Sequence, residues 1–494
     1  MKKKLLCLLL ALVLLLGNLP AVSAAANSGT WGNIHWSFDQ GTGELTITGS
    51  GDMPNTDFET PPWLRYKSSI RTATVGVGIT SLAKYCFNFC EALERVYLPD
   101  SLREIWGNAF YFCRNLTAVR LPPQLTYIEG EAFSHCERLT EIDIPASLKT
   151  LRGRIFDACG NLKKFTLHPG LEVVGKDAFR GTGVTALTLP NTVRAIEESA
   201  FERCSLEQIT LNEGLKSIGY RAFCDCANLR SITLPASLEY VGGSAFEFTP
   251  LKTVVVRCPN CNFSHDDGGI YGVFGAGGAT VYGAPGCRAQ QLIGMFPDCG
   301  YTFRALYFAD VAPGSWYFDA VSFAREHALF QGVGNQLFAP ESAMSRAMVV
   351  QVLYNYAGGG VQHENPFTDV PDGAWFMNAV CWAAKEGVIN GMGDGRFAPD
   401  APVTREQFAA IVYRFTQAQG IEPAETADLS GFPDAGSVSD WAAGAVAWAV
   451  GSGILTGSAV DGKTYLRPGS TATRAQVAAI MMRCLTYWSG RTKT

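Results

Sequence analysis

Apolar positions in the first half of the chain recur with a fixed period. One phenylalanine returns every 22 or 23 residues, at Phe87, Phe110, Phe133, Phe156, Phe179, Phe201, Phe223 and Phe246. A period this regular over eight copies predicts a solenoid, in which similar units stack and each contacts its neighbours. A solenoid presents an extended surface first and a catalytic pocket only rarely.

Each unit contains a short segment in which apolar and polar residues alternate. The unit reads A-F-x-x-C-x-x-L-x-x-φ-x-L-P-x-x-L-x-x-I, where φ is apolar. The φ-x-L segment predicts a strand, with inward-facing pairs at Val96/Leu98, Val119/Leu121, Ile142/Ile144, Phe165/Leu167, Leu187/Leu189, Ile209/Leu211, Ile232/Leu234 and Val254/Val256. A second apolar column follows at Leu102, Leu125, Leu148, Leu171, Val193, Leu215 and Leu238. Parallel stacking of strands about 5 Å apart buries both columns.

This pattern resembles the BspA-like leucine-rich repeats of bacterial surface proteins, over residues 70–257. Residues 27–69, with the hairpin-like stretch Gly41–Gly49, resemble the N-terminal β cap of such proteins. Residues 258–303 resemble their C-terminal cap. Caps are needed because the end repeats would otherwise expose their core.

A different period begins near Phe308. Three copies open with Phe-x-Asp at 308–310, 367–369 and 432–434, and a tryptophan follows soon after each. Each copy then carries a helical pattern, a turn (338–340, 397–399 or 466–468) and a second amphipathic helix that starts Ser345-Arg346, Thr404-Arg405 or Thr473-Arg474.

These motifs resemble three tandem S-layer homology (SLH) domains, at 304–357, 363–418 and 428–490. The resemblance implies an all-α triplet packed as a pseudo-trimer, so that the whole chain is an α+β multidomain protein. It also implies binding to secondary cell-wall polysaccharide, which is often pyruvylated. The residues that match the family motif, and are therefore the candidate glycan contacts, are Asp310, Trp316, Arg346, Asp369, Trp375, Arg405, Asp434, Trp441 and Arg474.

The start of the second helix suits an anionic ligand. Thr404 and Gln407 have the spacing of a capping box, as do Thr473 and Gln476. The next residue is arginine, and a guanidinium beside a helix N-terminus can grip a carboxylate in bidentate fashion. The alternative is that these residues only cap helices, with each arginine paired to a nearby aspartate and each tryptophan packed in the core.

Two of the three copies depart from the motif. In the first copy Ser345 replaces threonine and Met348 cannot complete the capping box, so a weaker pocket is expected. The third copy carries an irregular stretch, Ser458–Tyr465. Residues 457–464 fit the expression G-x-x-x-x-G-K-T, but they follow a helix and open none, so the match does not indicate a nucleotide site.

The first 25 residues predict a secretory signal peptide. Lys2–Lys4 precede an apolar run, Leu5–Leu16, that is too short to span a bilayer comfortably, and Val22-Ser23-Ala24 reads as a cleavage site. An uncleaved N-terminal anchor is the alternative. No later stretch is apolar and long enough to cross a membrane, so a secreted protein held non-covalently at the cell wall is expected.

Charge and cysteine content narrow the classes of partner. The formal net charge is −5, and cleavage of the signal peptide removes three lysines and no acidic residue. This negative charge argues against a nucleic-acid partner.

Six cysteines lie three residues after the repeat phenylalanine, at Cys90, Cys113, Cys136, Cys159, Cys204 and Cys226. We expect them to form a column of buried thiols, with disulfide bridges between rungs as the alternative. Cys258-x-x-Cys261 favours a local disulfide or free thiols over zinc. We expect no metal and no cofactor.

The outward strand positions do not identify a ligand for the repeats. They are mixed in charge at the N-terminal end, rich in threonine at the C-terminal end, and lack an aromatic stripe. No motif of a hydrolase is apparent, and the repeats and SLH copies account for both halves, so the protein is not expected to be an enzyme. The leading hypothesis is a wall-anchored surface protein whose repeats bind a protein or glycan in adhesion. The alternatives are a structural component of a surface layer and, less favoured, a wall-anchored hydrolase.

Overall fold

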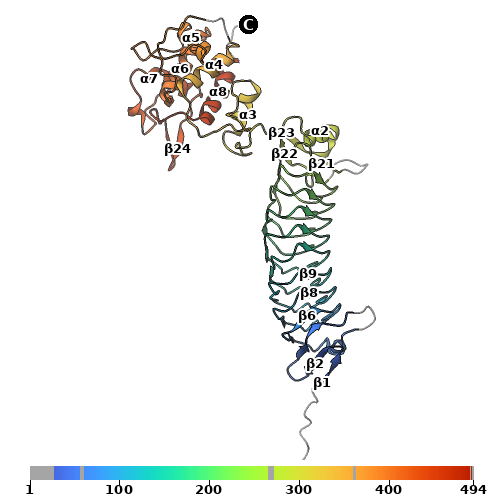
Figure 1. Ribbon diagram of the computed structural model, residues 1–494. Helices are drawn as coiled ribbons and strands as arrows, with labels where there is room; N and C mark the ends of the chain where they lie inside the picture. Colours follow the sequence, from blue (N-terminus) through green and yellow to red (C-terminus); the bar gives the residue numbers. More distant parts are fainter. Residues whose placement is uncertain (1–26, 56–59, 265–271, 360–362, 490, 492–494) are drawn as a thin grey trace, which may run out of the picture. The chain divides into compact units, whose positions relative to one another are not determined.

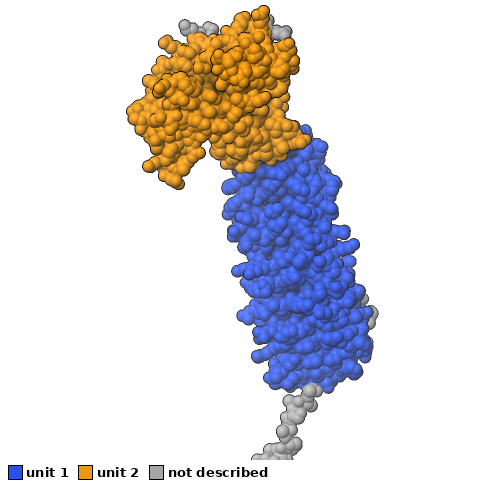
Figure 2. Space-filling model, turned by 60° about the vertical axis from the view of Figure 1, so that its left-hand side comes forward, with its two compact units in different colours: residues 1–304 blue, residues 305–494 orange. Residues whose placement is uncertain are grey.

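The computed structural model describes residues 27–55, 60–264, 272–359, 363–489 and 491 of the 494-residue chain. The predicted signal peptide at 1–25 lies outside the described residues. The chain forms two compact units, residues 1–304 and 305–494 (Figure 2). Among the described residues, no helix combines the length and the apolarity that crossing a bilayer requires.

Unit 1 begins with three antiparallel strands, β1 (Asn27–Trp31), β2 (Ile34–Asp39) and β3 (Glu44–Gly49). The predicted hairpin turn closes where the Gly43 N–H donates to the Asp39 carbonyl at 2.8 Å, with Gly43 at φ 76°. Trp63, in the 3-10 helix η1 (Pro62–Tyr66), is fully buried and donates from its indole N–H to the Cys86 carbonyl at 2.7 Å. These residues cover the open end of the first repeat.

The repeats form a β-solenoid of about ten turns over residues 72–305 (Figure 1). Its first ladder of strands consists of β5 (Thr72–Val75), β7 (Arg95–Tyr97), β10 (Glu141–Ile144), β12 (Lys164–Leu167), β14 (Ala186–Thr188), β16 (Gln208–Thr210), β18 (Ser231–Leu234), β20 (Thr253–Val256), β22 (Thr280–Gly283) and β23 (Thr302–Ala305). Ala118 joins this ladder through single bridges to Arg95 and Glu141. In β10 and β12, Ile142 lies opposite Phe165 in parallel register, which confirms that the sequence period is the step from rung to rung.

A second ladder runs along another side of the solenoid. Its strands are β4 (Gly51–Asp52), β6 (Ile79–Leu82), β8 (Glu104–Ile105), β9 (Tyr127–Ile128), β11 (Thr150–Leu151), β13 (Val173–Val174), β15 (Ala195–Ile196), β17 (Ser217–Ile218), β19 (Tyr240–Val241) and β21 (Asn262–Phe263). The predicted apolar column from Leu102 to Leu238 is buried in every copy. In the first ladder Leu98, Phe165 and Ile209 are only partly buried and pack against the core.

The repeat phenylalanines form a continuous stack through the core. All eight are fully buried, and successive rings lie 4.9–5.6 Å apart with interplanar angles of 20° or less. Stacked aromatic pairs of this kind contribute about 0.5–1.5 kcal/mol beyond their burial. Each period of 22 or 23 residues in the sequence therefore adds one ring to this stack.

The cysteine column has a specific hydrogen-bonding role. The fourteen cysteines among the described residues are free and buried. The Cys113 thiol donates to the Phe87 carbonyl of the preceding rung at 3.2 Å, and Cys136, Cys159, Cys204 and Cys226 make the same bond at 3.0–3.3 Å. In the last rung the hydroxyl of Thr249 replaces the thiol and donates to Phe223 at 2.6 Å. A small donor therefore suits the column, and Thr249 shows that threonine can stand in for cysteine there.

A second aromatic stack lies on the turns of the N-terminal rungs. Phe89 stacks on Phe112 at 5.1 Å and Phe112 on His135 at 4.1 Å. Phe89, Phe112 and His135 have φ angles of 53–59°, a conformation that residues other than glycine rarely adopt. The analysis of outward strand positions missed this stack because it lies on turns. Since the rings cover one another's faces, the stack offers few free faces to a sugar.

Unit 1 ends with a short helix beside the last strands. Helix α2 (Arg288–Met295) packs against β21 and β22, and the 3-10 helix η2 (Pro297–Cys299) leads into β23. The Tyr301 hydroxyl donates to the Gly275 carbonyl at 2.8 Å. No cluster of three or more potential metal ligands occurs among the described residues, and His265, which follows Cys258 and Cys261 in the sequence, lies outside them.

Unit 2 contains three copies of a helix pair. The pairs are α3 (Phe318–Glu326) with α4 (Arg346–Tyr356), α5 (Met377–Lys385) with α6 (Arg405–Ala418), and α7 (Ala443–Gly451) with α8 (Arg474–Ser489). The second helix of each copy packs against the first helix of the next, α4 on α5, α6 on α7, and α8 on α3. Because α8 returns to α3, the three copies close into a ring, as the pseudo-trimer expectation required.

Backbone bridges repeat the same cyclic order. Ser345 pairs with Pro402, Thr404 with Thr471, and Ala343 with Thr473, so each copy is bridged to both others just before its second helix. One addition departs from the all-α expectation. The irregular stretch of the third copy is a hairpin of β24 (Ser458–Val460) and β25 (Lys463–Tyr465), and the 3-10 helix η3 (Ala435–Ser437) precedes α7. The P-loop-like sequence lies in this hairpin and opens no helix.

Candidate functional site

The three opening aspartates clamp the turn of their own copy. Both carboxylate oxygens accept successive backbone N–H groups, Asp310 from Phe338 and Ala339 (2.8 and 2.7 Å), Asp369 from Phe397 and Ala398 (both 2.7 Å), and Asp434 from Leu466 and Arg467 (2.9 and 2.7 Å). The second turn residue has a positive φ in every copy, 56° at Ala339, 58° at Ala398 and 50° at Arg467. The carboxylate thus holds a backbone conformation that these residues would otherwise avoid.

The pKa of Asp369 reflects this geometry. Burial opposes ionisation, but the N–H groups of Phe397 and Ala398 outweigh it and hold the pKa of the carboxyl below its usual value. The aspartate is therefore a charged clamp at neutral pH.

The three helix-start arginines hold the same turns from the other side. Each lies at the first residue of α4, α6 or α8, and its Nε donates to a turn carbonyl in the next copy: Arg346 to Phe397 at 2.8 Å, Arg405 to Leu466 at 2.8 Å, and Arg474 to Phe338 at 2.7 Å. Arg346 and Arg474 also donate from Nη2, to Asn390 at 3.0 Å and Gln331 at 2.9 Å. Each turn is therefore fixed by the aspartate of its own copy and the arginine of the preceding one.

None of these arginines has a carboxylate partner within salt-bridge distance among the described residues. Arg405 and Arg474 are only 6% and 7% exposed. Burial lowers the pKa of Arg346, Arg405 and Arg474, although a guanidinium stays charged at neutral pH. Asp369, Asp434 and Asp310 attract Arg346, Arg405 and Arg474 respectively at longer range and offset part of the cost of burial. The alternative in which each arginine forms a direct salt bridge with a nearby aspartate is wrong, and each guanidinium can still accept an anion.

The predicted tryptophans lie at the surface. Trp316, Trp375 and Trp441 are 63%, 62% and 58% exposed, so the alternative of core packing does not hold for them. Trp316 and Trp375 make edge contacts with the next residue, Tyr317 at 5.3 Å and Phe376 at 5.2 Å, which leaves much of each indole open.

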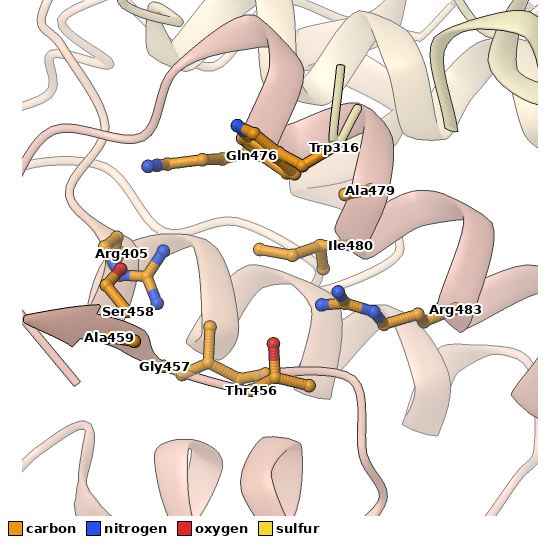
Figure 3. Close-up of a pocket in the computed structure, with 11 residues that line it drawn as sticks. Trp316, Arg405, Thr456, Gly457, Ser458, Ala459, Gln476, Ala479, Ile480 and Arg483 are labelled. Carbon is orange, nitrogen blue, oxygen red and sulfur yellow. The ribbon is translucent and has the colours of Figure 1, made fainter. Parts of the chain in front are cut away.

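Three pockets bring arginine and tryptophan together, and each is built from all three copies. We name each pocket by the copy whose second helix lines it. The first-copy pocket (310 Å³) is lined by α4 with Arg474 and Trp375, the second-copy pocket (510 Å³) by α6 with Arg346 and Trp441, and the third-copy pocket (370 Å³) by α8 with Arg405 and Trp316. Figure 3 shows Trp316 above the third-copy pocket, with Arg405 at one side.

The aspartates do not line these pockets. Their contacts give them a part in shaping the turn, and direct contact with a glycan stays a prediction. The sequence analysis missed other lining residues: the third residue of the helix (Met348, Gln407, Gln476), the tenth (Asn355, Arg414, Arg483) and the loop before the turn. Their equal spacing from the helix-start arginine was visible in the sequence and could have identified them.

Helix capping follows the sequence closely. Thr404 and Gln407 form a complete capping box, and Thr473 and Gln476 exchange the same two bonds at 3.3 and 3.4 Å. Ser345 accepts only the Met348 N–H, at 3.3 Å, because methionine cannot return the bond. The incomplete capping box of the first copy is confirmed, and the weaker pocket expected there stays a prediction.

Comparison with known families agrees with this geometry. The family described as BspA type leucine rich repeat region matches residues 65–182 and 154–265, in six copies. The S-layer homology domain matches residues 307–347, 366–409 and 431–478. Neither family is a catalytic domain.

Relatives of known name share part of the chain. The surface-layer 125 kDa protein of Lysinibacillus sphaericus is 30% identical over 167 residues, 34% of this chain and 14% of the relative. The amylopullulanase of Thermoanaerobacterium thermosulfurigenes is 28% identical over 219 residues, 41% of this chain and 12% of the relative. A leucine-rich repeat protein structure from Eubacterium ventriosum aligns with 56% of this chain and 85% of its own, at 18% identity and a TM-score of 0.33. The chain thus matches only 14% of the surface-layer protein and 12% of the amylopullulanase.

The fold and the family matches define a cell-surface protein. This chain is a surface protein that carries a BspA-type leucine-rich repeat region and three S-layer homology domains.

Proposed function

We propose that unit 2 anchors the protein non-covalently to secondary cell-wall polysaccharide, and that its pockets hold acidic ends of that glycan. The observation that carries the proposal is that each pocket places an arginine without a salt-bridge partner, buried for Arg405 and Arg474 and half-buried for Arg346, beside an exposed tryptophan. None of the lining residues is acidic. A carboxylate, such as that of a pyruvyl ketal, supplies the missing counter-charge, and the indole supplies an apolar face for the sugar ring.

The proposed roles of the predicted residues follow from their contacts. Arg346, Arg405 and Arg474 bind the anion through the guanidinium N–H groups that the turn carbonyls leave free. Trp316, Trp375 and Trp441 contact the sugar. Asp310, Asp369 and Asp434 act as positioning residues, because their carboxylates are already bonded to backbone N–H groups.

The named relatives support a portable anchor. Similarity extends to a surface-layer protein and to an amylopullulanase, whose names imply different tasks. A segment shared by such proteins suits a task independent of the rest of the chain. We infer that this chain itself catalyses no reaction, and hydrolysis of a wall polymer by the purified protein would contradict that inference.

We propose that unit 1 displays a binding surface for a protein or glycan in adhesion. A hollow of 730 Å³ on the first ladder is lined by side chains of both charges, among them Arg120, Glu141, Asp143 and Lys164. A mixed surface of this kind suits a polar partner rather than a strongly charged one. The likeness to a surface-layer protein favours a second candidate, a structural part of a surface layer, which ordered two-dimensional assembly of the purified protein would support.

Co-sedimentation with purified cell walls tests the anchor. The full chain, residues 27–304 and residues 305–494 are mixed with walls of a related Gram-positive bacterium, before and after extraction of the secondary polysaccharide. We expect the full chain and 305–494 to sediment only with the polysaccharide present. If residues 27–304 sediment and residues 305–494 do not, the repeats are the part that binds the wall, which would contradict the proposal.

A further inference from the structure

The three pockets differ in charge at one position. The tenth residue of the lining helix is Arg414 in the second-copy pocket, Arg483 in the third-copy pocket and Asn355 in the first-copy pocket. Two pockets therefore carry two arginines each, whereas the first-copy pocket carries Arg474 alone.

Asparagine at this position keeps the structural bond but not the charge. Arg483 donates from Nη1 to the Ile454 carbonyl at 3.2 Å, and Asn355 donates from Nδ2 to the Leu329 carbonyl at 3.1 Å. Ile454 and Leu329 occupy equivalent places, three residues before Gly457 and Gly332. Since a neutral amide satisfies this carbonyl, the fold does not require a cation at this position.

The second arginine lies within electrostatic reach of the first. Figure 3 shows the guanidinium groups of Arg405 and Arg483 pointing toward one another across the third-copy pocket, on either side of Ile480. Burial lowers the pKa of Arg405, the charges of Arg467 and Arg483 lower it further, and Asp434 opposes them. Burial and the charge of Arg414 lower the pKa of Arg346, and Asp369 opposes them. For Arg474 burial lowers the pKa and Asp310 opposes this, with no second arginine involved.

Asp434 and Asp369 offset part of this repulsion, although neither carboxylate lines these pockets. No acidic side chain lines them, and Arg414 has no hydrogen-bond or salt-bridge partner among the described residues. The terminal nitrogens of Arg405 likewise have no protein acceptor there. The second cation of each pair, which the fold does not need, makes an anion between the two guanidinium groups more favourable. In the first-copy pocket Met348 also replaces the polar Gln407 and Gln476.

We propose that acidic glycan ends bind in the second-copy and third-copy pockets only, and that Arg414 and Arg483 are the residues that select them. This inference rests on the proposed anchoring function. It predicts two acidic sites in each chain rather than three, with the first-copy pocket left for a neutral sugar residue.

Isothermal titration of the full mature chain tests the number of sites. The probe is a methyl glycoside that carries one pyruvyl ketal, and its carboxyl methyl ester is the uncharged control. We expect two sites for the wild type, one for Arg414→Asn or Arg483→Asn, and none for the double variant. The gain-of-function variant Met348→Gln/Asn355→Arg is expected to add a third site. Unchanged melting curves would show that the asparagine variants fold.

The outcomes separate this inference from the anchor itself. Three sites in the wild type, or two sites retained in the double variant, would overturn the selection by Arg414 and Arg483 while wall binding stands. Wild-type protein that sediments with walls but does not bind the acidic probe would also overturn the selection by Arg414 and Arg483. Failure to sediment with polysaccharide-bearing walls would instead overturn the proposed function.

Discussion

Replacing Asp369 with alanine removes the clamp on one turn. Two charge-assisted bonds of 2.7 Å, from the N–H groups of Phe397 and Ala398, are lost together. Hydrogen bonds to charged groups contribute about 1.5–3 kcal/mol each. Because the site is only partly buried and water can replace one bond, we expect a total loss of about 2–3 kcal/mol. In a unit of this size 1 kcal/mol shifts Tm by about 2–4 °C, so the transition of unit 2 is expected to fall by about 5–10 °C.

Differential scanning calorimetry of the full chain measures this shift. Asp372→Ala, at an exposed position of the same segment, is the matched control and is expected to change Tm by less than about 1 °C. Ala398→Gly, which relieves the φ of 58°, is expected to recover part of the loss in the Asp369→Ala background. A fall in Tm no larger than that of the control would refute the clamp.

Four further results follow from the same contacts. Burial raises the pKa of Cys204 to about 11 and that of Cys90 to about 12, so iodoacetamide at pH 8 should label these thiols only after unfolding; rapid labelling of the native protein would count against the buried column. Cys113→Thr should keep the bond to Phe87, whereas Cys113→Val should lower the free energy of unfolding by about 1–3 kcal/mol in urea titrations. Trp316→Ala should change stability by less than about 0.5 kcal/mol but weaken wall binding, and a stability loss typical of a core tryptophan would contradict its exposed position. Because the folded pKa of Asp369 is depressed, its contribution to stability is present above a pH of about 3.9 and is lost as the pH falls through the folded value, which acid unfolding of wild type against Asp369→Asn can measure.

Much of unit 1 could be predicted from periodicity. A solenoid repeats one set of contacts, so the spacing of the phenylalanines locates the eight rungs that carry them and both of their apolar columns. The roles of polar positions could not be predicted in this way. The bond from Cys113 to the carbonyl of Phe87 forms because neighbouring rungs are in register, which the sequence does not show. The turn positions with positive φ were also missed, because they hold residues such as Phe89 instead of the glycine that usually indicates this conformation.

Unit 2 shows the same limit more clearly. The motif residues were visible, but their partners lie in other copies. Arg474 bonds to Phe338, and Trp316 lines a pocket beside Arg405. A linear reading assigned aspartate, tryptophan and arginine to one site within each copy, whereas the ring distributes them over neighbouring copies. The tenth helix residue was overlooked because its importance appears only when the three pockets are compared.

Unit 2 is proposed to hold an acidic wall glycan through the arginines of its pockets. The most direct measurement is a titration of the full mature chain with purified secondary wall polysaccharide, before and after mild acid removes its ketal-linked carboxylates. We predict tight binding to the intact polymer, at least tenfold weaker binding after removal, and a similar loss when Arg414 and Arg483, which hold no turn, are replaced by asparagine in a protein with an unchanged melting curve. Equal affinity for both forms of the polymer would contradict the claim.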